Sequence, residues 1–256
     1  MSIIPVLLYH SVDDRPRPRD RPFAVSRAEF EAHAAAIRSS GRSSLRISEL
    51  AAGLRGERVL PERALAVTFD DGFANTYEAV ETLLGGGIAS TVYVPTGSIG
   101  QPDRLAHSRL WELANATLVE VGAHSVSHPY LDELDSREVA EEVGASKAQL
   151  EQMAGVTVSS FSYPHGAYDR RVREAVIAAG YRSAVAVKNA LSHTDDDPFA
   201  IARWTVMAGT PASRVAEVLE GQGVPRAWAH ERLRTVAFRI VRRGRRRLAG
   251  RLRVRQ

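Results

Sequence analysis

Two adjacent carboxylates followed by a glycine are the clearest candidates for chemistry in this sequence. Asp70, Asp71 and Gly72 come directly after the apolar run Ala64–Phe69, which has the length and composition of a buried strand. Adjacent residues at the extended end of a strand point to different sides. One carboxylate could therefore bind a metal ion while its neighbour faces a water molecule or a substrate. An ordinary strand, turn and helix, with acids near the positive helix N-terminus, explains this stretch equally well when it is taken alone.

A pair of histidines four residues apart is the second candidate. His124 and His128 frame the segment HSVSH, which follows the strand candidate 117–121. If this segment turns helically, both imidazoles lie on one face and within reach of one ion. Two surface or capping histidines are the alternative. Two imidazoles and one carboxylate, however, are a common ligand set for a catalytic divalent metal with open positions, and the chain has no cysteine that could supply thiolates.

Two further segments place polar groups directly after strand candidates. Tyr163, Pro164, His165 and Gly166 form a tight turn that could aim a backbone N–H at an oxyanion, although a plain turn would look the same. His10 follows the first apolar run and could instead be a hydrogen-bonded histidine of the core. Both segments contribute to a site only if the fold brings them to the same end as the acidic pair.

Short apolar runs alternate with amphipathic segments along most of the chain. We expect strands over residues 3–8, 64–69, 89–94, 117–121, 156–163, 183–187 and 201–206. We expect helices over residues 27–40, 47–54, 76–84, 136–153, 169–179 and 211–220, the first opened by a capping box of Ser26 and Glu29. The alternation predicts parallel βαβ units, and seven strands favour a barrel with its site at the C-terminal strand ends. Residues 96–110 are expected to form a polar loop that could act as a lid.

The bulk properties indicate a globular protein with an appendage. The chain has 256 residues, of which 44% are apolar and 25% are charged. The N-terminus lacks the basic region and cleavage site of a signal peptide, and no apolar run is long enough to span a membrane. We therefore expect a cytoplasmic protein that consists of one domain over residues 1–222 and an Arg-rich tail over residues 223–256.

Charge is distributed unevenly between this tail and the rest of the chain. Residues 226–256 contain twelve arginines and one glutamate, a net charge of +11, which leaves −7 on residues 1–225. Apolar residues recur at helical spacing among the arginines, which predicts an amphipathic helix that could hold the protein on the inner, anionic face of a membrane. A partly disordered basic tail explains the composition equally well. Nucleic-acid binding is not expected, because the tail lacks stacking aromatics and a recognisable module.

The motifs, in their order, resemble those of one known family, the polysaccharide deacetylases, also called the NodB homology domain or carbohydrate esterase family 4. The matching segments are residues 68–72 (TFDDG), 124–128 (HSVSH) and 161–166 (FSYPHG). Residues 8–12 (LYHSV) are similar to the branch whose members begin with a YH segment. The resemblance covers about residues 3–210, and therefore most of the predicted domain.

The resemblance implies a distorted (β/α)7 barrel that hydrolyses an N-acetyl group, or sometimes an O-acetyl group, on a sugar. We expect a poly- or oligosaccharide substrate, and the basic tail adds lipid-linked sugars to the candidates. It implies that Asp71, His124 and His128 hold a divalent metal, usually zinc, and that Asp70 is the general base. The backbone N–H of His165, which replaces the usual tyrosine of the family, would then help to bind the oxyanion together with the turn at Tyr163 and Pro164. The chemistry fits, because a metal can polarise the acetyl carbonyl and lower the pKa of a bound water towards about 7.

The sequence also departs from the family pattern. No arginine precedes the proline turn, and the late Leu-x-His motif that often supplies the general acid has no convincing match. We assign the missing acid to His10. Arg203 could orient Asp70 in place of the absent arginine, although a surface or salt-bridged arginine is an equally good interpretation.

Two other functions remain open from the sequence. A hydrolase of O-acetyl esters or of another non-peptide C–N bond would use the same metal site. A non-catalytic protein that binds sugar or membrane on the same barrel is disfavoured, because the acidic pair (Asp70 and Asp71) and the histidine pair (His124 and His128) are both present. A glycosidase is disfavoured as well, since Asp70 and Asp71 are neighbours and cannot flank a glycosidic bond.

Overall fold

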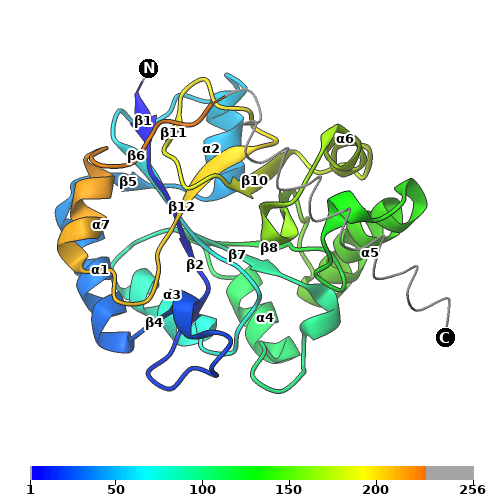
Figure 1. Cartoon of the computed structure of the whole chain (residues 1–256), viewed down its shortest axis with the longest axis horizontal. Helices are drawn as coiled ribbons and strands as arrows, with labels where there is room; N and C mark the ends of the chain where they lie inside the picture. Colours follow the sequence, from blue (N-terminus) through cyan, green and yellow to red (C-terminus); the bar gives the residue numbers. More distant parts are fainter. Residues whose placement is uncertain (1, 229–256) are drawn as a thin grey trace, which may run out of the picture.

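Seven parallel strands close into a barrel in the computed structural model, which describes residues 2–228 (Figure 1). Around the barrel the order is β2, β12, β10, β9, β8, β7 and β6, and β6 pairs back onto β2 through the register Val6↔Ala66 to Tyr9↔Phe69. This confirms the predicted distorted (β/α)7 barrel. The strands are β2 (Val6–Tyr9), β6 (Ala64–Phe69), β7 (Ser90–Val94), β8 (Val119–Ala123), β9 (Ser160–Ser162), β10 (Ser183–Val187) and β12 (Ile201–Thr205).

Short strands and the helices complete this layer structure. The short pairs are β1 (Ile3–Ile4) with β11 (Ser192–His193), β3 (Ser11–Val12) with β4 (Ala24–Val25), and β5 (Ser43–Ser44) with β6. The α-helices are α1 (Arg27–Ser39), α2 (Ile47–Leu54), α3 (Thr76–Gly85), α4 (His107–Ala114), α5 (Ser136–Ala154), α6 (Arg170–Ala178) and α7 (Ala212–Leu219). Single 3-10 turns are η1 (Arg21–Phe23), η2 (Thr96–Ser98), η3 (Leu131–Glu133) and η4 (Pro164–Gly166).

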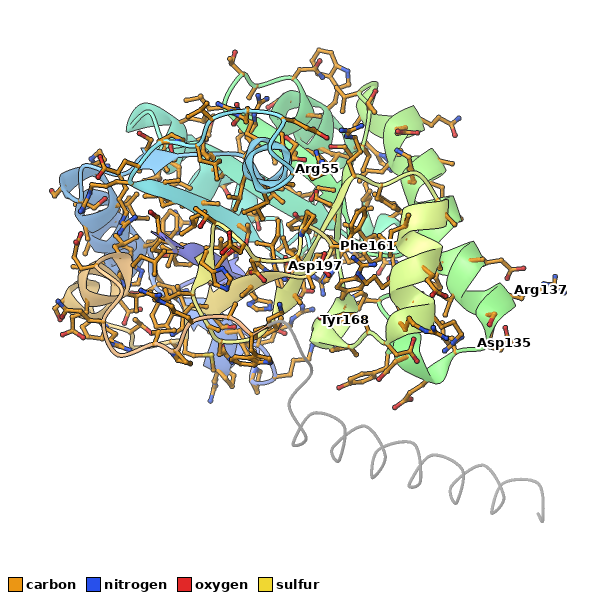
Figure 2. All side chains as sticks on the ribbon, turned by 90° about the horizontal axis from the view of Figure 1, so that it is seen from above. Arg55, Asp135, Arg137, Phe161, Tyr168 and Asp197 are labelled. Atoms are coloured by element: carbon orange, nitrogen blue, oxygen red, sulfur yellow. The ribbon has the colours of Figure 1, made fainter. Side chains whose placement is uncertain are left out.

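Capping residues explain where two of the helices begin. The Ser26 side chain accepts from Glu29 N while the Glu29 carboxylate accepts from Ser26 N, so the predicted capping box is confirmed. The Asp135 carboxylate accepts from Arg137 N and Glu138 N at the start of α5, which Figure 2 shows at the outer edge of the molecule. Each cap satisfies backbone donors that have no partner within their own helix.

Two predictions for single elements are wrong. Residues 107–110, which were expected to belong to a polar loop, begin helix α4; its N-cap is Ala106, so no side-chain cap signals its start. It forms because Leu110 and Leu113 pack into the core. The strand predicted over residues 156–163 is reduced to Ser160–Ser162, because only these residues pair with β10 along this segment.

The barrel interior changes character from one end to the other. Near the start of the strands, Ile47 and Leu50 of α2 pack with inward-facing Val6, Ala66 and Val185. Further along, the inward-facing positions are polar and buried: Thr68, Asp70, Ser162 and Arg203. Helix α2 therefore plugs one end with apolar side chains, and the C-terminal strand ends form a polar mouth.

The chain packs against the barrel as far as the described residues extend. Leu191 N donates to Pro225 O (2.8 Å) and Ala227 N donates to Leu191 O (2.7 Å), and Ala227 is buried beside Ala190. The amphipathic helix predicted for the basic tail lies outside the described residues. Among residues 2–228, no helix combines the length and the apolar character that a bilayer span requires.

Buried His33 predicts how stability depends on pH. Its ring contacts the Tyr9 hydroxyl (3.3 Å) and Thr210 O (2.8 Å), and burial lowers its pKa below the ordinary 6.5, although the Thr210 bond opposes this. As the pH falls through 6.5, His33 binds a proton more readily in the unfolded chain than in the folded one. The free energy of unfolding should therefore fall as the pH falls. Denaturation of metal-free protein between pH 8 and 5 should show a smaller fall for His33→Gln. Equal slopes for both proteins would contradict this assignment.

Candidate metal centre

Three side chains from two distant segments meet at the mouth of the barrel. Asp71 follows β6, whereas His124 and His128 follow β8, and β7 lies between these strands. One ligand atom from each residue lies within 4.8 Å of the other two. Asp71 Oδ1 is 3.2 Å from His128 Nε2 and 3.6 Å from His124 Nε2, and the two Nε2 atoms are 3.1 Å apart. The structure thus brings together the three residues predicted as metal ligands.

The sequence led us to expect that the two carboxylates point to different sides, but both approach the same imidazole. Asp70 Oδ2 and Asp71 Oδ1 lie 3.7 Å and 3.6 Å from the same atom, His124 Nε2. The reason is the backbone of Asp71, whose φ of 71° is left-handed and not extended. Gly72 (φ 59°) continues the turn, and a Cβ at this position would lie 2.7 Å from the Val94 side chain.

The histidine segment is a turn and not the helix turn that was considered from its spacing. Ser125 (φ 63°) and His128 (φ 59°) are both left-handed. Glu142 of α5 holds the turn, because its carboxylate accepts from Val126 N (2.8 Å), Ser127 N (2.9 Å) and the Ser127 hydroxyl (2.6 Å). The imidazoles therefore converge through backbone geometry that the i, i+4 pattern does not encode.

The orientation of His124 leaves the lone pair of its Nε2 atom free to bind a metal ion. Its Nδ1 lies 2.7 Å from the carbonyl oxygen of Ser162, so Nδ1 carries the proton and donates it. When the ring is neutral, as a metal ligand must be, Nε2 is the bare nitrogen and faces Asp71 and His128. A hydrogen bond of this kind on the far nitrogen is typical of histidines that bind metals.

The spacing of the ligand atoms fits a small tetrahedral ion. Zinc bonds of about 2.0–2.1 Å place the ligand atoms of a tetrahedron about 3.3–3.4 Å apart. The three separations at this centre are 3.1, 3.2 and 3.6 Å. Two imidazoles and one carboxylate match the ligand types of catalytic zinc sites with an open position. The residues present therefore fit the metal that the family resemblance implied.

Asp70 is held by a buried arginine of β12, which is separated from β6 by β2 alone. Arg203 Nη1 and Nη2 donate to Asp70 Oδ1 and Oδ2, each at 2.7 Å, and the Ser162 hydroxyl also donates to Oδ2 at 3.1 Å. Burial alone would raise the pKa of Asp70, but the charges of Arg203 and His124 outweigh it and lower that pKa. Asp70 is therefore an oriented carboxylate at neutral pH. Arg203 thus occupies the place proposed for it from the sequence, 133 residues away along the chain.

His10 lies at the edge of the same group. Its Nδ1 is buried and has no hydrogen-bond partner among residues 2–228, and its ring packs on Phe23 with 5.1 Å between centroids. Burial lowers the pKa of His10, whereas the charges of Asp70 and Asp71 raise it in part. His10 therefore lies within electrostatic range of both carboxylates of the acidic pair.

The turn after β9 contributes His165 to the rim. The His165 ring stacks on Tyr130 (3.9 Å between centroids, 17°) and meets the His128 ring edge-on (4.3 Å, 68°). Burial and the neighbouring His128 lower the pKa of His165 to about 4, so its ring is neutral at physiological pH. Pro164 is buried at the start of this turn, and His165 is left-handed (φ 58°). Its backbone N–H remains a prediction for the oxyanion donor.

The side chain of Tyr163 is not part of this rim, contrary to the expectation that placed it in the substrate site. Its hydroxyl donates to Phe199 O (3.0 Å), and its ring stacks on Tyr168 (4.3 Å between centroids, 14°). Successive residues of a strand face opposite sides, so Ser162 points into the barrel and Tyr163 points towards the helices. Tyr163 contributes its backbone carbonyl, which accepts from Gly166 N (2.9 Å) and closes the turn.

Sequence reasoning missed several residues that organise the centre. Ser162 hydrogen-bonds to both Asp70 and Arg203. Glu142 supports the histidine turn, and Tyr130 stacks on the His165 ring. Ser160 and Ser162 alternate with Phe161 in β9, which is a weak sign of polar groups inside the barrel. Glu142 is an ordinary helix-surface residue by its pattern, so no local signal identifies it.

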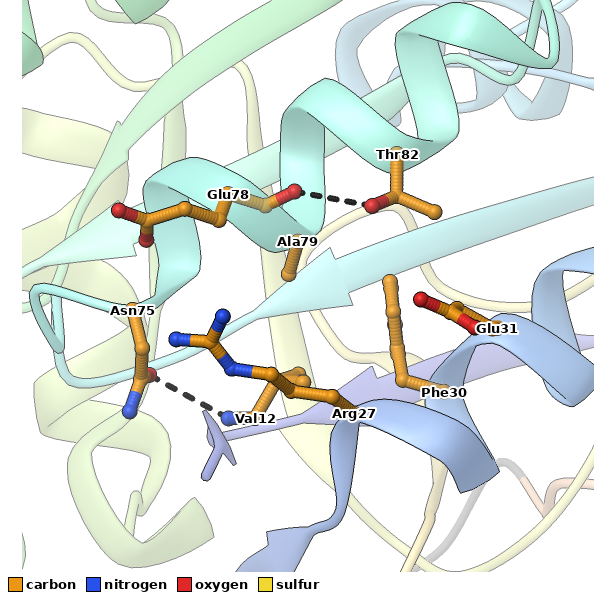
Figure 3. A pocket seen from close by; sticks show the side chains of 8 residues that line it. All are labelled: Val12, Arg27, Phe30, Glu31, Asn75, Glu78, Ala79 and Thr82. Carbon is orange, nitrogen blue, oxygen red and sulfur yellow. Dashed lines mark hydrogen bonds between the residues drawn. The ribbon is translucent and has the colours of Figure 1, made fainter. Parts of the chain in front are cut away.

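Two clefts lie near this end of the molecule. One of about 90 Å³ lies between α1 and α3, where Figure 3 shows Asn75 accepting from Val12 N, and it contains none of the candidate ligands. The other, of about 180 Å³, is lined by residues of the segments 11–20 and 73–75 and by Asp103. These segments begin directly after His10 and Gly72, but none of the candidate ligands lines the second cleft.

Comparisons with known sequences agree with this site. A family model described as polysaccharide deacetylase matches residues 57–184, which include the acidic pair and both histidines of the centre. YxkH of Bacillus subtilis, assigned by name to the polysaccharide deacetylases, is 26% identical over 218 residues, 85% of this chain and 76% of that protein. The poly-beta-1,6-N-acetyl-D-glucosamine N-deacetylase of Escherichia coli is 28% identical over 138 residues, 48% of this chain but 20% of that protein.

Solved structures show the same fold. The deacetylase PplD of Streptococcus pyogenes superposes with a TM-score of 0.77 at 18% identity, over 85% of this chain and 98% of that one. IcaB from Ammonifex degensii superposes with a TM-score of 0.73 at 24% identity, over 86% and 98% of the two chains. With the family model matching half of the sequence and the acidic and histidine motifs meeting in space, the chain belongs to the polysaccharide deacetylase family.

Proposed function

We propose that this protein is a metal-dependent hydrolase that removes the N-acetyl group from an amino sugar of a poly- or oligosaccharide. The observation that supports it most directly is the triangle of Asp71, His124 and His128 beside the arginine-bound carboxylate of Asp70. Zinc is the ion we expect, because two imidazoles and one carboxylate suit it. When bound, such an ion would stabilise negative charge on the acetyl oxygen and make water a better nucleophile.

The residues of the chain would supply the proton transfers. Asp70, ionised and oriented by Arg203, would take a proton from the attacking water as its oxygen bonds to the acetyl carbon. The backbone N–H of His165 would donate to the oxygen that becomes negative. The C–N bond then breaks, and His10 would give a proton to the departing nitrogen. The products are acetate and a free amine.

The E. coli relative is named for a polymer of N-acetylglucosamine, which supports including such polymers among candidate substrates. An O-acetyl ester or another non-peptide C–N bond would meet the same carboxylates and imidazoles.

We also propose that the basic tail binds anionic lipid and holds a cytoplasmic enzyme near lipid-linked sugars. Sedimentation of full-length protein and residues 1–225 with anionic vesicles tests it, and equal binding would refute it.

Removal of the metal should abolish activity reversibly. Protein treated with a chelator is expected to release acetate at least about 100-fold more slowly from N-acetylated oligosaccharides, and added Zn²⁺ should restore the rate. His124→Ala should contain little zinc by elemental analysis and should not be restored. His193→Ala is the matched control, since His193 lies in β11 outside the candidate centre. Undiminished acetate release from metal-free protein would refute the proposed function.

A further inference from the structure

The loop between β7 and α4, residues 95–106, contacts the turn that contains both histidines. Thr96 N donates to Ser125 O (3.1 Å), and Gly97 N donates to Val126 O (2.9 Å). A Cβ at position 97 would lie 2.9 Å from Val126 O, so the close approach requires glycine. The beginning of this loop is thus bonded to the backbone between His124 and His128.

The end of the same loop contacts the turn that contains the acidic pair. Leu105 N donates to Gly72 O (2.9 Å), and Ala74 N donates to Asp103 O (3.1 Å). A bond inside the loop, from Gly100 N to Leu105 O (2.9 Å), ties its two parts together. The segment that looked like a lid in the sequence is therefore bonded to both ligand-bearing turns.

Arg104 adds a side chain to these backbone contacts. Its Nη1 donates to the backbone carbonyl of Asp71 at 2.7 Å, and its guanidinium lies 4.3 Å from the centre of the Phe73 ring. The arginine binds the carbonyl oxygen, so the Asp71 carboxylate remains available as a ligand. The stacking on Phe73 fixes the planar group in a half-buried position.

Asp71 needs such support because its backbone conformation is unfavourable. A left-handed φ of 71° is unfavourable for a residue other than glycine, because its Cβ crowds the backbone. Relaxation of Asp71 towards an extended conformation would turn its carboxylate away from His124 and His128. A bond from Arg104 to the carbonyl of this residue stabilises the conformation in which the three ligand atoms meet.

We propose that residues 95–106 form a brace that preorganises the metal centre, and that Arg104 is its positioning residue. The brace connects the turn after β6 with the turn after β8, which otherwise belong to strands separated by β7. This inference rests on the proposed metal site. It adds that metal affinity depends on a residue that does not itself contact the ion.

Arg104→Met tests the brace by removing the donors while keeping an apolar stem over Phe73. We expect the Zn²⁺ dissociation constant, measured by competition with a chelator, to rise about 10–100-fold, as for other groups that orient metal ligands. Arg104→Lys should recover part of the affinity, because it restores one charged donor without the planar group. Arg109→Met is the matched control: Arg109 also stacks on an aromatic ring, Tyr77 (4.0 Å), and pairs with Glu112 away from the centre.

The outcomes separate this inference from the proposed function. If the wild-type protein binds no zinc, the proposed function fails. If it binds zinc and Arg104→Met binds within threefold as tightly, the inference alone is refuted, whatever the change in melting temperature. An equal loss of affinity in Arg109→Met would refute it too. Should Arg104→Met not fold, Arg104→Lys decides, since an affinity equal to wild type would show that the planar donor has no positioning role.

Discussion

Asp70→Asn is expected to lower acetate release by about 10³-fold while the zinc content stays at the wild-type level. General base catalysis typically contributes about 10²–10⁴-fold, and Asp70 is outside the group of three residues whose ligand atoms converge. The asparagine amide has one oxygen and cannot accept hydrogen bonds from both Arg203 nitrogens, so its NH2 group would face one of these donors. The variant should therefore also be less stable, and rates must be measured well below its melting temperature.

A second buried carboxylate controls for this loss of stability. The side chain of Asp196 is as deeply buried as that of Asp70. It pairs with Lys188 at 3.4 Å and lies in the segment before β12. Asp196→Asn should lose stability without losing acetate release. Near-normal turnover in Asp70→Asn would rule out Asp70 as the base. A loss of zinc together with activity would show instead that Asp70 is a metal ligand.

Arg203→Met is expected to have the largest effect on stability. Arg203 is fully buried, and its charge is the strongest influence that lowers the pKa of Asp70 against the opposing effect of burial. Without it Asp70 becomes an unpaired buried charge, which costs about 3–5 kcal/mol of a total stability of about 5–15 kcal/mol. Urea denaturation at pH 7 measures the loss. Arg137→Met is the control, because its pair with Glu141 is exposed and such pairs contribute about 0–1 kcal/mol.

The same variant should reverse the pH dependence of this pair. In the wild-type protein the pKa of Asp70 is lower when folded than the ordinary 3.8, so its contribution is present above that pH and is lost as the pH falls through the folded pKa. In Arg203→Met burial would raise the pKa of Asp70, so the variant should regain stability as the pH falls from 7 to 5. Combining Arg203→Met with Asp70→Asn should recover much of the stability at pH 7. If the double variant is as unstable as Arg203→Met, the pairing of the two charges does not explain the loss.

Local pattern was sufficient to predict most of the architecture. The apolar run Ala64–Phe69 and the helix Ile47–Leu54 have the predicted bounds, because strand and helix periodicity depends on residues within one short window. The order of the motifs was also sufficient to predict which residue types would meet: one carboxylate and two imidazoles at the C-terminal strand ends. Helix α4 was missed because its start has no capping side chain, and packing of Leu110 and Leu113 decides it.

The sequence by itself determined the barrel, the types of the candidate ligands and the end of the barrel where they lie. Only the tertiary structure decided how they are oriented. Asp71 and His128 are left-handed although neither is glycine, and this depends on bonds from other segments, such as those of Arg104 and Glu142. The bond between Arg203 and Asp70 forms only when β12 and β6 both flank β2 in the closed barrel. Such contacts join residues far apart in the chain, so no local window of sequence encodes them.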